Sequence, residues 1–356
     1  MDENTFMDFV HKAVGDVGAL FAGSMVVLGD RLGLYRAMAD GRPTGSSALA
    51  ERTGTTERYV REWLAAQAAA GYLEYLGGDL DGQDRGAAQY RLPAERAAVL
   101  TDETNPFCVI GAFQTALAAV HSTDRLTTAF RTGEGVGWAD HDPDLYPGCE
   151  RLFGPSYRNF LATTWIPSLV GMDERLRAGA RVADVGCGHG ASTLVMAQAY
   201  PSSSFLGVDA HQTSVESARK RAAEAGVSER VKFEVGTALT FGGSYDLVAF
   251  FDCLHDMGDP AGACAHVREV LNPGGALMIV EPHAGDRVED NLNPVGALYY
   301  AASTLLCTPS AVSQGGDALG AQAGEERMRA VVTGAGFSSF RRVAETPFNQ
   351  VYEARV

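Results

Sequence analysis

Residues 181–210 read RVADVGCGHGASTLVMAQAYPSSSFLGVDA, and this stretch decides the fold. A short apolar strand runs into a glycine-rich loop and an amphipathic helix, and a second apolar strand then ends on Asp209. Such a turn needs glycines because a ligand can press against the backbone only where no Cβ intervenes, and the helix N-terminus supplies free N–H groups. An acid at the end of the second strand can accept hydrogen bonds from both ribose hydroxyls of an adenosine. The stretch therefore predicts a nucleoside-binding unit.

The loop is compatible with two kinds of ligand. With Ala191 counted, it satisfies G-x-G-x-x-G/A and permits a dinucleotide. Asp184 argues against that ligand, because a carboxylate two residues before the first glycine would repel a pyrophosphate but suits a cationic amino-acid group. S-adenosylmethionine has an ammonium, a sulfonium and no phosphate. We therefore favour it over a dinucleotide and over a structural turn that binds no ligand.

The residues that follow continue the alternation of strands and helices. Further apolar strands are predicted at 231–238, at 245–257 together with its C-terminal loop, and at 276–283, and helical patterns cover 213–226 and 261–271. Near-continuous apolar strands that alternate with helices imply a parallel sheet covered on both faces, whose ligands lie beyond the carboxyl ends of the strands. We therefore predict an α/β fold with a Rossmann-like, doubly wound sheet.

The N-terminal part has a different pattern. Helices are predicted at 28–38, 46–54 and 56–75, and a polar hairpin follows that ends at 89–95. Three helices and a hairpin in this order predict a mostly helical, winged-helix-like domain. In DNA-binding regulators the recognition helix of such a module enters the major groove.

The charge of the chain argues against nucleic acid as a partner. Its 29 Lys and Arg stand against 44 Asp and Glu, a net charge of −15, whereas a phosphate backbone is bound by clustered cations. The third predicted helix offers only Arg58 and Arg61 between acids and a long alanine-rich face. That face, residues 63–71 with the neighbouring Tyr59, Trp63 and Leu64, suits packing against protein. We therefore expect a twofold dimer through this domain and no binding of nucleic acid.

Length and composition fit an ordinary two-domain enzyme. The chain has 356 residues, of which 46% are apolar and 21% charged. It begins without a basic region and apolar stretch, and no uninterrupted apolar run reaches the ~18 residues of a membrane span. We therefore expect a soluble, cytoplasmic protein. Six scattered cysteines without a CxxC pair indicate reduced thiols rather than disulfides or a zinc site.

From about residue 165 to the end, the chain resembles class I S-adenosylmethionine-dependent methyltransferases. With the winged-helix-like part in front, it resembles the small-molecule O-methyltransferases of plant phenylpropanoid and bacterial polyketide pathways. It is also similar to actinobacterial winged-helix methyltransferases that share its GCGHG loop, CLHDM segment and EDNLNP stretch. The resemblance implies S-adenosylmethionine as cofactor and a homodimer in which the first domain helps to roof the partner's pocket.

The resemblance also implies a division of the chain into three parts. Residues 1–98 would form the winged-helix-like dimerisation domain, and 99–165 a helical linker and pocket lid. Residues 166–356 would form the methyltransferase domain, with an insertion at 284–316.

The resemblance supplies two catalytic candidates. In the O-methyltransferases a histidine after the fourth strand acts as general base and an acid after the fifth strand orients it; the matching residues here are His255 and Glu281. A histidine in this loop also titrates near neutral pH and can remove a proton as the methyl arrives. A second acid of the family aligns with Gln322, which removes a charge. The alternatives are a histidine that only hydrogen-bonds its loop and an acid that caps the next one.

The cofactor contacts depart from the family in part. The acid that usually receives the adenine amino group is replaced by the run of Thr237 and Ala238, which leaves a hydroxyl or a backbone carbonyl for that contact. The lysine that often meets the methionyl carboxylate is Phe251, so the backbone or an outside residue such as Arg158 must hold it. The residues assigned to the cofactor are Asp184, Gly186, Gly188, Gly190, Asp209, Ala210, Thr237, Ala238 and Asp252.

Aromatic residues concentrate in 99–165 and 284–316, the two segments expected to cover the cleft. Aromatics on helices are more often core residues than ligand contacts, but their concentration here indicates an apolar acceptor. The candidates for its pocket are Trp138, Tyr146, Tyr157, Trp165, Tyr300 and Cys307. The acidic run 138–144 is a candidate mobile loop. No metal is expected, because His141 lacks a second histidine at helical spacing.

We therefore expect methyl transfer from S-adenosylmethionine to a small molecule, as O-methylation in secondary metabolism with His255 as general base. Two alternatives stay open. One is C- or N-methylation, in which His255 only orients the acceptor. The other is a winged-helix transcriptional regulator that senses S-adenosylmethionine or a metabolite, which a basic face on the winged helix would favour; the sequence lacks such a face.

Overall fold

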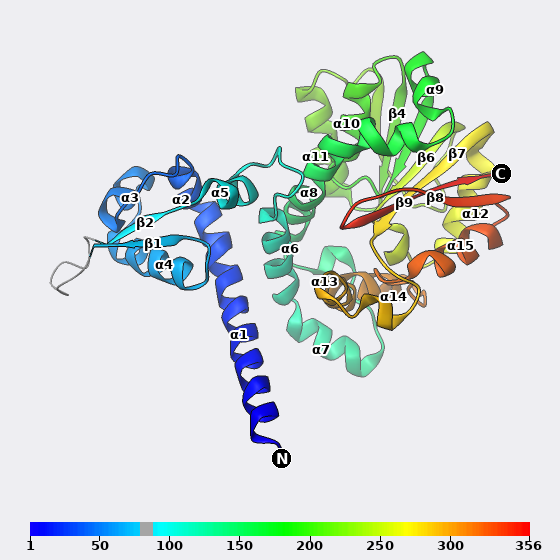
Figure 1. The fold of residues 1–356 in the computed structure, drawn as a ribbon. Coiled ribbons are helices and arrows are strands. Elements are labelled where there is room, and N and C mark those ends of the chain that lie inside the picture. Colours follow the sequence, from blue (N-terminus) through cyan, green and yellow to red (C-terminus); the bar gives the residue numbers. More distant parts are fainter. Residues whose placement is uncertain (79–87) are drawn as a thin grey trace. The chain divides into compact units, whose positions relative to one another are not determined.

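The computed structural model describes residues 1–78 and 88–356, which form two compact units, Met1–Leu117 and Ala118–Val356 (Figure 1). The turn of the predicted hairpin falls outside the described residues. The predicted linker, 99–165, contributes residues to both units.

Unit 1 is a mostly helical domain with a two-stranded antiparallel sheet. Apolar side chains from its helices surround the buried ring of Tyr35, which packs edge-on against Trp63 with 5.0 Å between ring centroids. The elements are α1 (Glu3–Arg31), α2 (Leu34–Met38), α3 (Ser46–Thr53), α4 (Glu57–Ala69), β1 (Glu74–Gly77), β2 (Gln89–Arg91), α5 (Ala94–Thr101) and α6 (Ile110–Val120), the last of which crosses the boundary. The central helices and the β1–β2 hairpin confirm the predicted winged-helix-like fold.

The first helix is much longer than predicted. The single helix expected at 28–38 is wrong, because α1 already begins at Glu3 and ends at Arg31. The side chain of Asp2 caps its first turn by accepting from a backbone N–H of that turn at 2.9 Å. Gly33, with φ of +69°, then separates α1 from α2, because few residues other than glycine adopt this conformation.

The N-terminal part of α1 extends away from the other elements of unit 1 (Figure 1), and its apolar side chains are largely exposed. The side chains of α1 that are at least half exposed include Phe6, Phe9, Val17, Leu20 and Phe21. In contrast, Trp63 and Leu64, which were expected to add apolar surface beside 63–71, are buried in the core. That detail of the predicted dimer contact is wrong, and the exposed apolar surface lies on α1 instead.

Two described helical stretches are long and apolar enough to cross a membrane, α1 and residues 294–313. Core helices of soluble proteins pass the same test, so length and composition alone are weak support for a span. In α1 the ion pair between Lys12 and Asp16, at 2.5 Å, interrupts the apolar surface.

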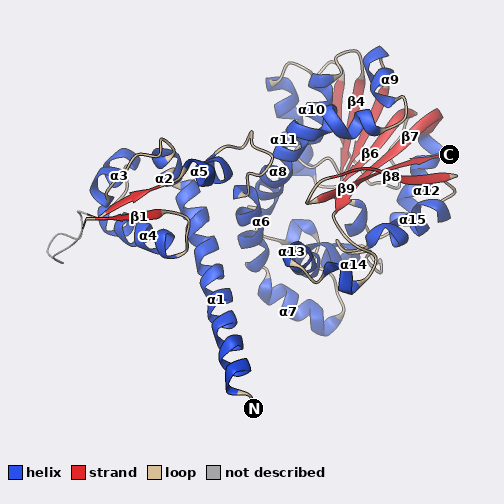
Figure 2. Ribbon diagram, viewed as in Figure 1, coloured by secondary structure: helices blue, strands red, loops and turns tan. Residues whose placement is uncertain are grey.

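Unit 2 contains a seven-stranded sheet in the order β5-β4-β3-β6-β7-β9-β8 (Figure 2). The first five strands in this order run parallel, whereas β9 pairs antiparallel with both β7 and β8. The strands are β3 (Arg181–Val185), β4 (Ser204–Asp209), β5 (Val231–Val235), β6 (Tyr245–Phe251), β7 (Leu271–Pro282), β8 (Ser339–Glu345) and β9 (Asn349–Arg355). The predicted strands are present, and β7 begins before the predicted residue 276.

Both faces of this sheet are covered, because alternate residues of each strand point to opposite sides. In β6, Leu247 and Ala249 belong to one apolar cluster, and Val248 and Phe250 to another. The helices of this layered part are α9 (Met172–Ala178), α10 (Ala191–Ala199), α11 (Gln212–Glu224), α12 (Pro260–Val270) and α15 (Gly324–Gly334). The layers confirm the predicted α/β, doubly wound fold.

Two further segments of unit 2 pack against each other. The first carries α7 (Thr123–Thr132), η1 (Trp138–Asp140), α8 (Leu145–Ser156), η2 (Tyr157–Trp165) and η3 (Ile166–Ser168); the second carries η5 (Val288–Asn291), α13 (Pro294–Ala302), η6 (Ser303–Cys307) and α14 (Thr308–Ser313). The N–H of Val136 donates to the carbonyl of Pro309 at 3.0 Å. Leu145 and Leu306 share one apolar cluster. The insertion at 284–316 thus braces the segment that precedes the sheet.

Gly207 in β4 offers a test of this packing. A Cβ at this position would lie 2.3 Å from Phe233 Cδ1 and 2.9 Å from Cys187 Sγ. Gly207→Ala should therefore lower the free energy of unfolding by about 1–3 kcal/mol, the usual cost of overpacking a core. Chemical denaturation measures the change. Gly242→Ala is the matched control, because no atom lies within 4 Å of its Cβ position; equal effects of the two substitutions would contradict the packing described for β4.

Candidate functional site

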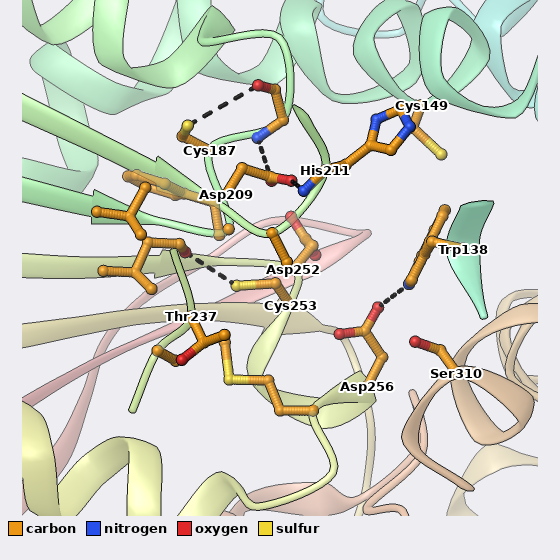
Figure 3. Close-up of a pocket in the computed structure, with 18 of the residues that line it drawn as sticks. Trp138, Cys149, Cys187, Asp209, His211, Thr237, Asp252, Cys253, Asp256 and Ser310 are labelled. Carbon is orange, nitrogen blue, oxygen red and sulfur yellow. Dashed lines mark hydrogen bonds between the residues drawn. The ribbon is translucent and has the colours of Figure 1, made fainter. Parts of the chain in front are cut away.

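A cavity of ≈ 410 Å³ lies at the carboxyl ends of the parallel strands in unit 2 (Figure 3). Loops after β3, β4, β5 and β6 form one part of its wall. Side chains from η1, α8, η2 and α14 form the rest, namely Trp138, Tyr146, Cys149, Glu150, Phe153, Tyr157, Ser310 and Gln314. This is the edge of the sheet at which ligands of such folds bind.

The glycine loop after β3 lies directly against this cavity. Gly186 and Gly188 line it with φ of +77° and +52°, while Gly190, with φ of +78°, precedes α10. A Cβ on Gly186 would lie 2.7 Å from the sulfur of Cys253. The loop therefore needs glycine for its backbone conformation and for its close approach to the β6 loop, as well as for any ligand.

Asp209, at the end of β4, fixes the shape of the loop. One of its carboxylate oxygens accepts from the N–H of Gly188 at 2.8 Å, and the other accepts from the N–H of His211 at 2.9 Å. The side chain lines the cavity, as do the neighbouring Ala210 and the predicted Thr237 and Ala238. An acid in this position can still accept from ribose hydroxyls, because each carboxylate oxygen has two lone-pair directions.

Asp184 lies one layer behind the cavity wall. Its Oδ2 accepts from the hydroxyls of Ser192 and Thr193 at 2.6 Å each, whereas its buried Oδ1 has no hydrogen-bond partner among the described residues. Burial raises the pKa of Asp184 to about 6, although the two hydroxyls lower it. The expectation that Asp184 faces the cleft directly is therefore wrong; its free oxygen is held just behind the glycine loop.

Asp252, directly after β6, is a second buried acid with a free oxygen. It adopts φ of +50°, which is rare for a residue other than glycine. Its Oδ1 accepts from the side-chain amide of Asn349 at 2.8 Å, and its Oδ2 has no partner among the described residues. Burial and the charge of Glu281 raise the pKa of Asp252 well above its usual value. The side chain lines the cavity.

These acids fit a cationic ligand rather than a pyrophosphate. Unpartnered buried carboxylate oxygens are costly, and an ammonium group that donates to them would remove that cost. No Lys or Arg lines the cavity among residues 1–78 and 88–356. Arg158, the candidate for the methionyl carboxylate, is exposed and does not line the cavity, so the structure does not place it there.

His255 and Glu281 form the predicted pair. The imidazole Nδ1 is hydrogen-bonded to the Glu281 carboxylate, and both side chains are buried. Burial lowers the pKa of His255, but Glu281 and Cys307 outweigh it and raise the pKa well above its usual value. Nε2 lies 3.3 Å from the sulfur of Cys307. Neither member of the pair lines the cavity itself.

Gln322, which aligns with the second acid of the family, forms no hydrogen bond with His255 or Glu281 in the described structure. Its amide donates to the carbonyls of His283 at 3.1 Å and Ala321 at 2.9 Å. Its carbonyl oxygen is buried and has no partner among the described residues.

Asp256 is the residue of this loop that does line the cavity, and the sequence reasoning missed it. Its Oδ2 accepts from the indole N–H of Trp138 at 2.9 Å (Figure 3). Burial raises the pKa of Asp256 to about 6, although the charge of His255 and the hydrogen bond from Trp138 lower it. The signal was available, because Asp256 directly follows His255 in the CLHDM segment.

A second group that the sequence did not reveal lies on α8. The ring of Tyr146 stacks on His211, with centroids 4.1 Å apart and an interplanar angle of 8°. Glu150 is hydrogen-bonded to His189 Nδ1 at 2.9 Å and forms an ion pair with Arg221. Both contacts attach α8 to the loops after β3 and β4. They join residues far apart in the sequence, so local patterns could not show them.

The predicted acceptor residues divide into two groups. Trp138, Tyr146 and Tyr157 line the cavity. Trp165, Tyr300 and Cys307 do not: Trp165 belongs to the core of the sheet, and Cys307 contacts His255. For Trp165 the structure supports the role of a core aromatic, which is the more frequent one for aromatics on helices.

The described residues hold no group of three or more His, Cys, Asp or Glu that could bind a metal ion. His141 is buried, and its Nδ1 is hydrogen-bonded to the hydroxyl of Ser122 at 2.8 Å. None of the six cysteines, all of which lie within the described residues, forms a disulfide.

Comparisons with known proteins agree with this description. A family model described as "Methyltransferase domain" matches residues 176–324, and one described as "Rv2258c-like winged HTH domain" matches residues 21–102. The 27-O-demethylrifamycin SV methyltransferase of Amycolatopsis mediterranei is 36% identical over 107 residues, 29% of this chain and 39% of that protein. An uncharacterized 37.1 kDa protein in transposon TN4556 of Streptomyces fradiae is 36% identical over 107 residues, 30% of this chain and 31% of that protein. The chain thus spans less than half the length of these relatives.

Solved structures extend the likeness to nearly the whole chain. The mitomycin 7-O-methyltransferase MmcR has a TM-score of 0.69 at 19% identity, over 99% of this chain and 100% of that chain. Human N-acetylserotonin methyltransferase, solved in complex with SAM, has a TM-score of 0.68 at 16% identity, over 97% of each chain. At these identities the likeness shows the fold.

Residues 21–102 therefore match a winged helix–turn–helix domain and residues 176–324 a methyltransferase domain, and the chain shares its fold with solved S-adenosylmethionine-dependent methyltransferases. The predicted class and fold are confirmed. S-adenosylmethionine, the predicted cofactor, is also the ligand that the free acid oxygens at the cleft fit.

Asp209→Ala should weaken the binding of S-adenosylhomocysteine by about 1–3 kcal/mol, because it removes the expected acceptor for the ribose and the hydrogen bond from the N–H of Gly188 in the glycine loop. Isothermal titration calorimetry measures the affinity. Glu216→Gln, an exposed change on α11, serves as the control. Unchanged affinity in the Asp209 variant would show that the nucleoside is bound elsewhere.

Proposed function

We propose that the protein transfers the methyl group of S-adenosylmethionine to a hydroxyl of a small molecule, in secondary metabolism. The observation that supports this most is the buried pair of His255 and Glu281 one layer from a cleft built for a nucleoside. The likeness to a rifamycin-pathway enzyme and to a mitomycin O-methyltransferase supports the same class of acceptor.

The residues of the cleft divide the work of binding. S-adenosylmethionine supplies an electrophilic methyl group on its sulfonium. Asp209 would hold the ribose, and the free oxygen of Asp252 would hold the ammonium, with the buried carboxylate of Asp184 attracting it from behind the glycine loop. Tyr146 and Glu150 would cover the nucleoside from α8, because both contact the loops around it. Most of the rate enhancement would then come from holding the acceptor in line with the methyl group.

The neutral form of His255, with its proton on Nδ1 toward Glu281, would receive the acceptor's proton at Nε2. In the structure this nitrogen faces the thiol of Cys307, and a thiol is a weak hydrogen-bond partner that an acceptor hydroxyl can replace. Glu281 would hold the ring through Nδ1 and stabilise the imidazolium that forms. C- or N-methylation is the second candidate, in which His255 would only orient the acceptor.

A transcriptional regulator is less well supported by the winged helix. On α4, Arg58 pairs with Glu62 and Arg61 pairs with Glu57, each at 2.6 Å. These i,i+4 pairs neutralise the two cations that would meet DNA phosphates. We therefore keep a soluble, cytoplasmic enzyme without a nucleic-acid partner as part of the proposal.

The proposal includes a homodimer that covers α1. Unit 1 leaves the apolar side chains of α1 uncovered along most of a 29-residue helix. Exposed apolar surface of this extent is typical of protein interfaces, and a twofold axis would pair α1 with itself.

The role of His255 is tested by its titration and its removal. Glu281→Gln should lower the pKa of His255, because the carboxylate raises it; NMR titration of the imidazole measures the change without any acceptor.

His255→Ala should lower turnover on the order of a hundredfold and leave the affinity for S-adenosylhomocysteine nearly intact. With a phenolic acceptor, part of the activity should return toward pH ~10, where a phenol ionises unaided.

Cys307→Ala is the control for these variants, because it uncovers Nε2 without touching the pair. It should retain turnover. A His255→Ala enzyme with near-normal turnover between about pH 6 and 9 would contradict the base assignment and favour orientation alone.

The dimer is tested by charges on α1. Phe9→Asp with Phe21→Asp should convert a dimer into a monomer in light scattering, because burying two carboxylates without partners is unfavourable. Tyr59→Asp on α4, where the side chain is 79% exposed, should leave the dimer intact. A monomeric wild type, or a wild type that floats with lipid vesicles through α1, would contradict the proposed contact.

A further inference from the structure

The part of the cavity away from the glycine loop contains one buried carboxylate that the proposed chemistry does not use. Asp256 is only 8% exposed, yet it lines the cavity. Its Oδ2 accepts from the indole N–H of Trp138, and its backbone carbonyl accepts from the side-chain amide of Gln314 at 3.2 Å. No residue of the described chain donates to Oδ1, which Figure 3 shows turned toward the interior of the cavity. Half of this carboxylate is therefore open to a ligand.

The other acids of the cavity wall are already accounted for. Glu150 is paired with Arg221 and His189. Asp209 holds two backbone N–H groups. Asp259 is exposed and caps α12 by accepting from the N–H of Gly262 at 2.7 Å. Only Asp252 and Asp256 keep a free oxygen toward the cavity.

These two free acids have different neighbours in the cavity wall. Asp252 is hydrogen-bonded to Asn349 and lies near the middle of the view in Figure 3, where the ammonium of the cofactor is expected. Asp256 is hydrogen-bonded to Trp138 and lies nearer to Ser310. A single ammonium group on the cofactor therefore leaves Asp256 without a partner.

The charge of Asp256 has no compensating cation. The charged groups around it are His255, Glu281, Asp209 and Asp252, of which only His255 can carry a positive charge. A protonated His255 is already balanced by Glu281, to which it is hydrogen-bonded. No Lys or Arg from the described ranges, 1–78 and 88–356, lines the cavity. The part of the cavity wall formed by Asp256 and Trp138 thus carries a negative charge that no cation compensates, beside an indole ring.

We propose that Asp256 and Trp138 bind a protonated amine on the acceptor, so that the substrate class is amine-bearing hydroxylated aromatic compounds rather than carboxylates. The inference rests on the proposed methyl transfer but concerns only recognition of the acceptor. A buried carboxylate attracts a cation strongly, because the surroundings screen it poorly. An indole face attracts an ammonium group as well. The same charge repels a carboxylate or a phosphate on the acceptor.

Three probes of one shape separate the effect of charge from that of the ring. Tyramine, para-ethylphenol and para-hydroxyphenylpropionate share a phenol and a two-carbon chain and differ in whether they carry a cation, no charge or an anion. We expect the protein loaded with S-adenosylhomocysteine to bind tyramine on the order of tenfold more tightly than para-ethylphenol, which corresponds to one charge-assisted hydrogen bond. The propionate should bind most weakly. Calorimetry measures all three without turnover.

Asp256→Asn should reduce the affinity for tyramine to that for para-ethylphenol and leave the latter unchanged, because only the charge is lost. Asp259→Asn is the matched control; it removes a carboxylate from the same wall while asparagine still caps α12, and it should keep the preference. The affinity of each variant for S-adenosylhomocysteine checks that the fold and the nucleoside site are intact.

Three outcomes would overturn the inference: no binding of tyramine, equal binding of tyramine and para-ethylphenol, or a preference that survives Asp256→Asn. The proposed function fails by a different result, which is the absence of S-adenosylhomocysteine binding to the wild type. The two failures are therefore distinguishable in one set of titrations.

Discussion

The hold of Asp209 on the glycine loop is the interaction on which the site depends. Its carboxylate accepts hydrogen bonds from the backbone N–H groups of Gly188 and His211. These bonds fix the loop after β3 and the residue before α11 next to the end of β4. His211 then presents its ring to Tyr146, which brings α8 over the cleft. One side chain thus links the sheet, the loop and the covering helix.

The second constraint is the concentration of buried acids at the same edge. Burial raises the pKa values of Asp184 and Asp256 to about 6 and that of Asp252 well above its usual value. At a pH above its raised pKa, each ionised acid lowers the free energy of unfolding. This destabilisation becomes smaller as the pH falls and the acid takes up a proton. A cationic ligand offsets it without protonation. Burial of these acids therefore lowers the stability of the fold at neutral pH, and perturbed pKa values of this kind are typical of functional sites.

Sequence reasoning could predict what local patterns and chain order carry. The strands are marked by apolar runs, the glycine loop by its spacing, and Asp209 by its place at the end of a strand. The pairing of His255 with Glu281 could be expected because parallel strands bring their carboxyl ends to one edge.

The remainder depends on packing between distant segments. Trp138 meets Asp256 across 118 residues of chain, and Tyr146 meets His211 only after α8 has docked. The sequence did not reveal the length of α1, because most of this helix is exposed and lacks the stripe of buried apolar residues by which helices are predicted. Trp165 was assigned to the pocket because an aromatic residue gives no sign in the sequence of whether it faces core or cavity.

The most direct test of this account is a crystal structure of the protein with S-adenosylhomocysteine. The account predicts the ribose hydroxyls on Asp209, the adenine between the loops after β4 and β5, and the ammonium on the free oxygen of Asp252. Density for the nucleoside away from Asp209, or an ammonium that does not contact Asp252, would contradict it.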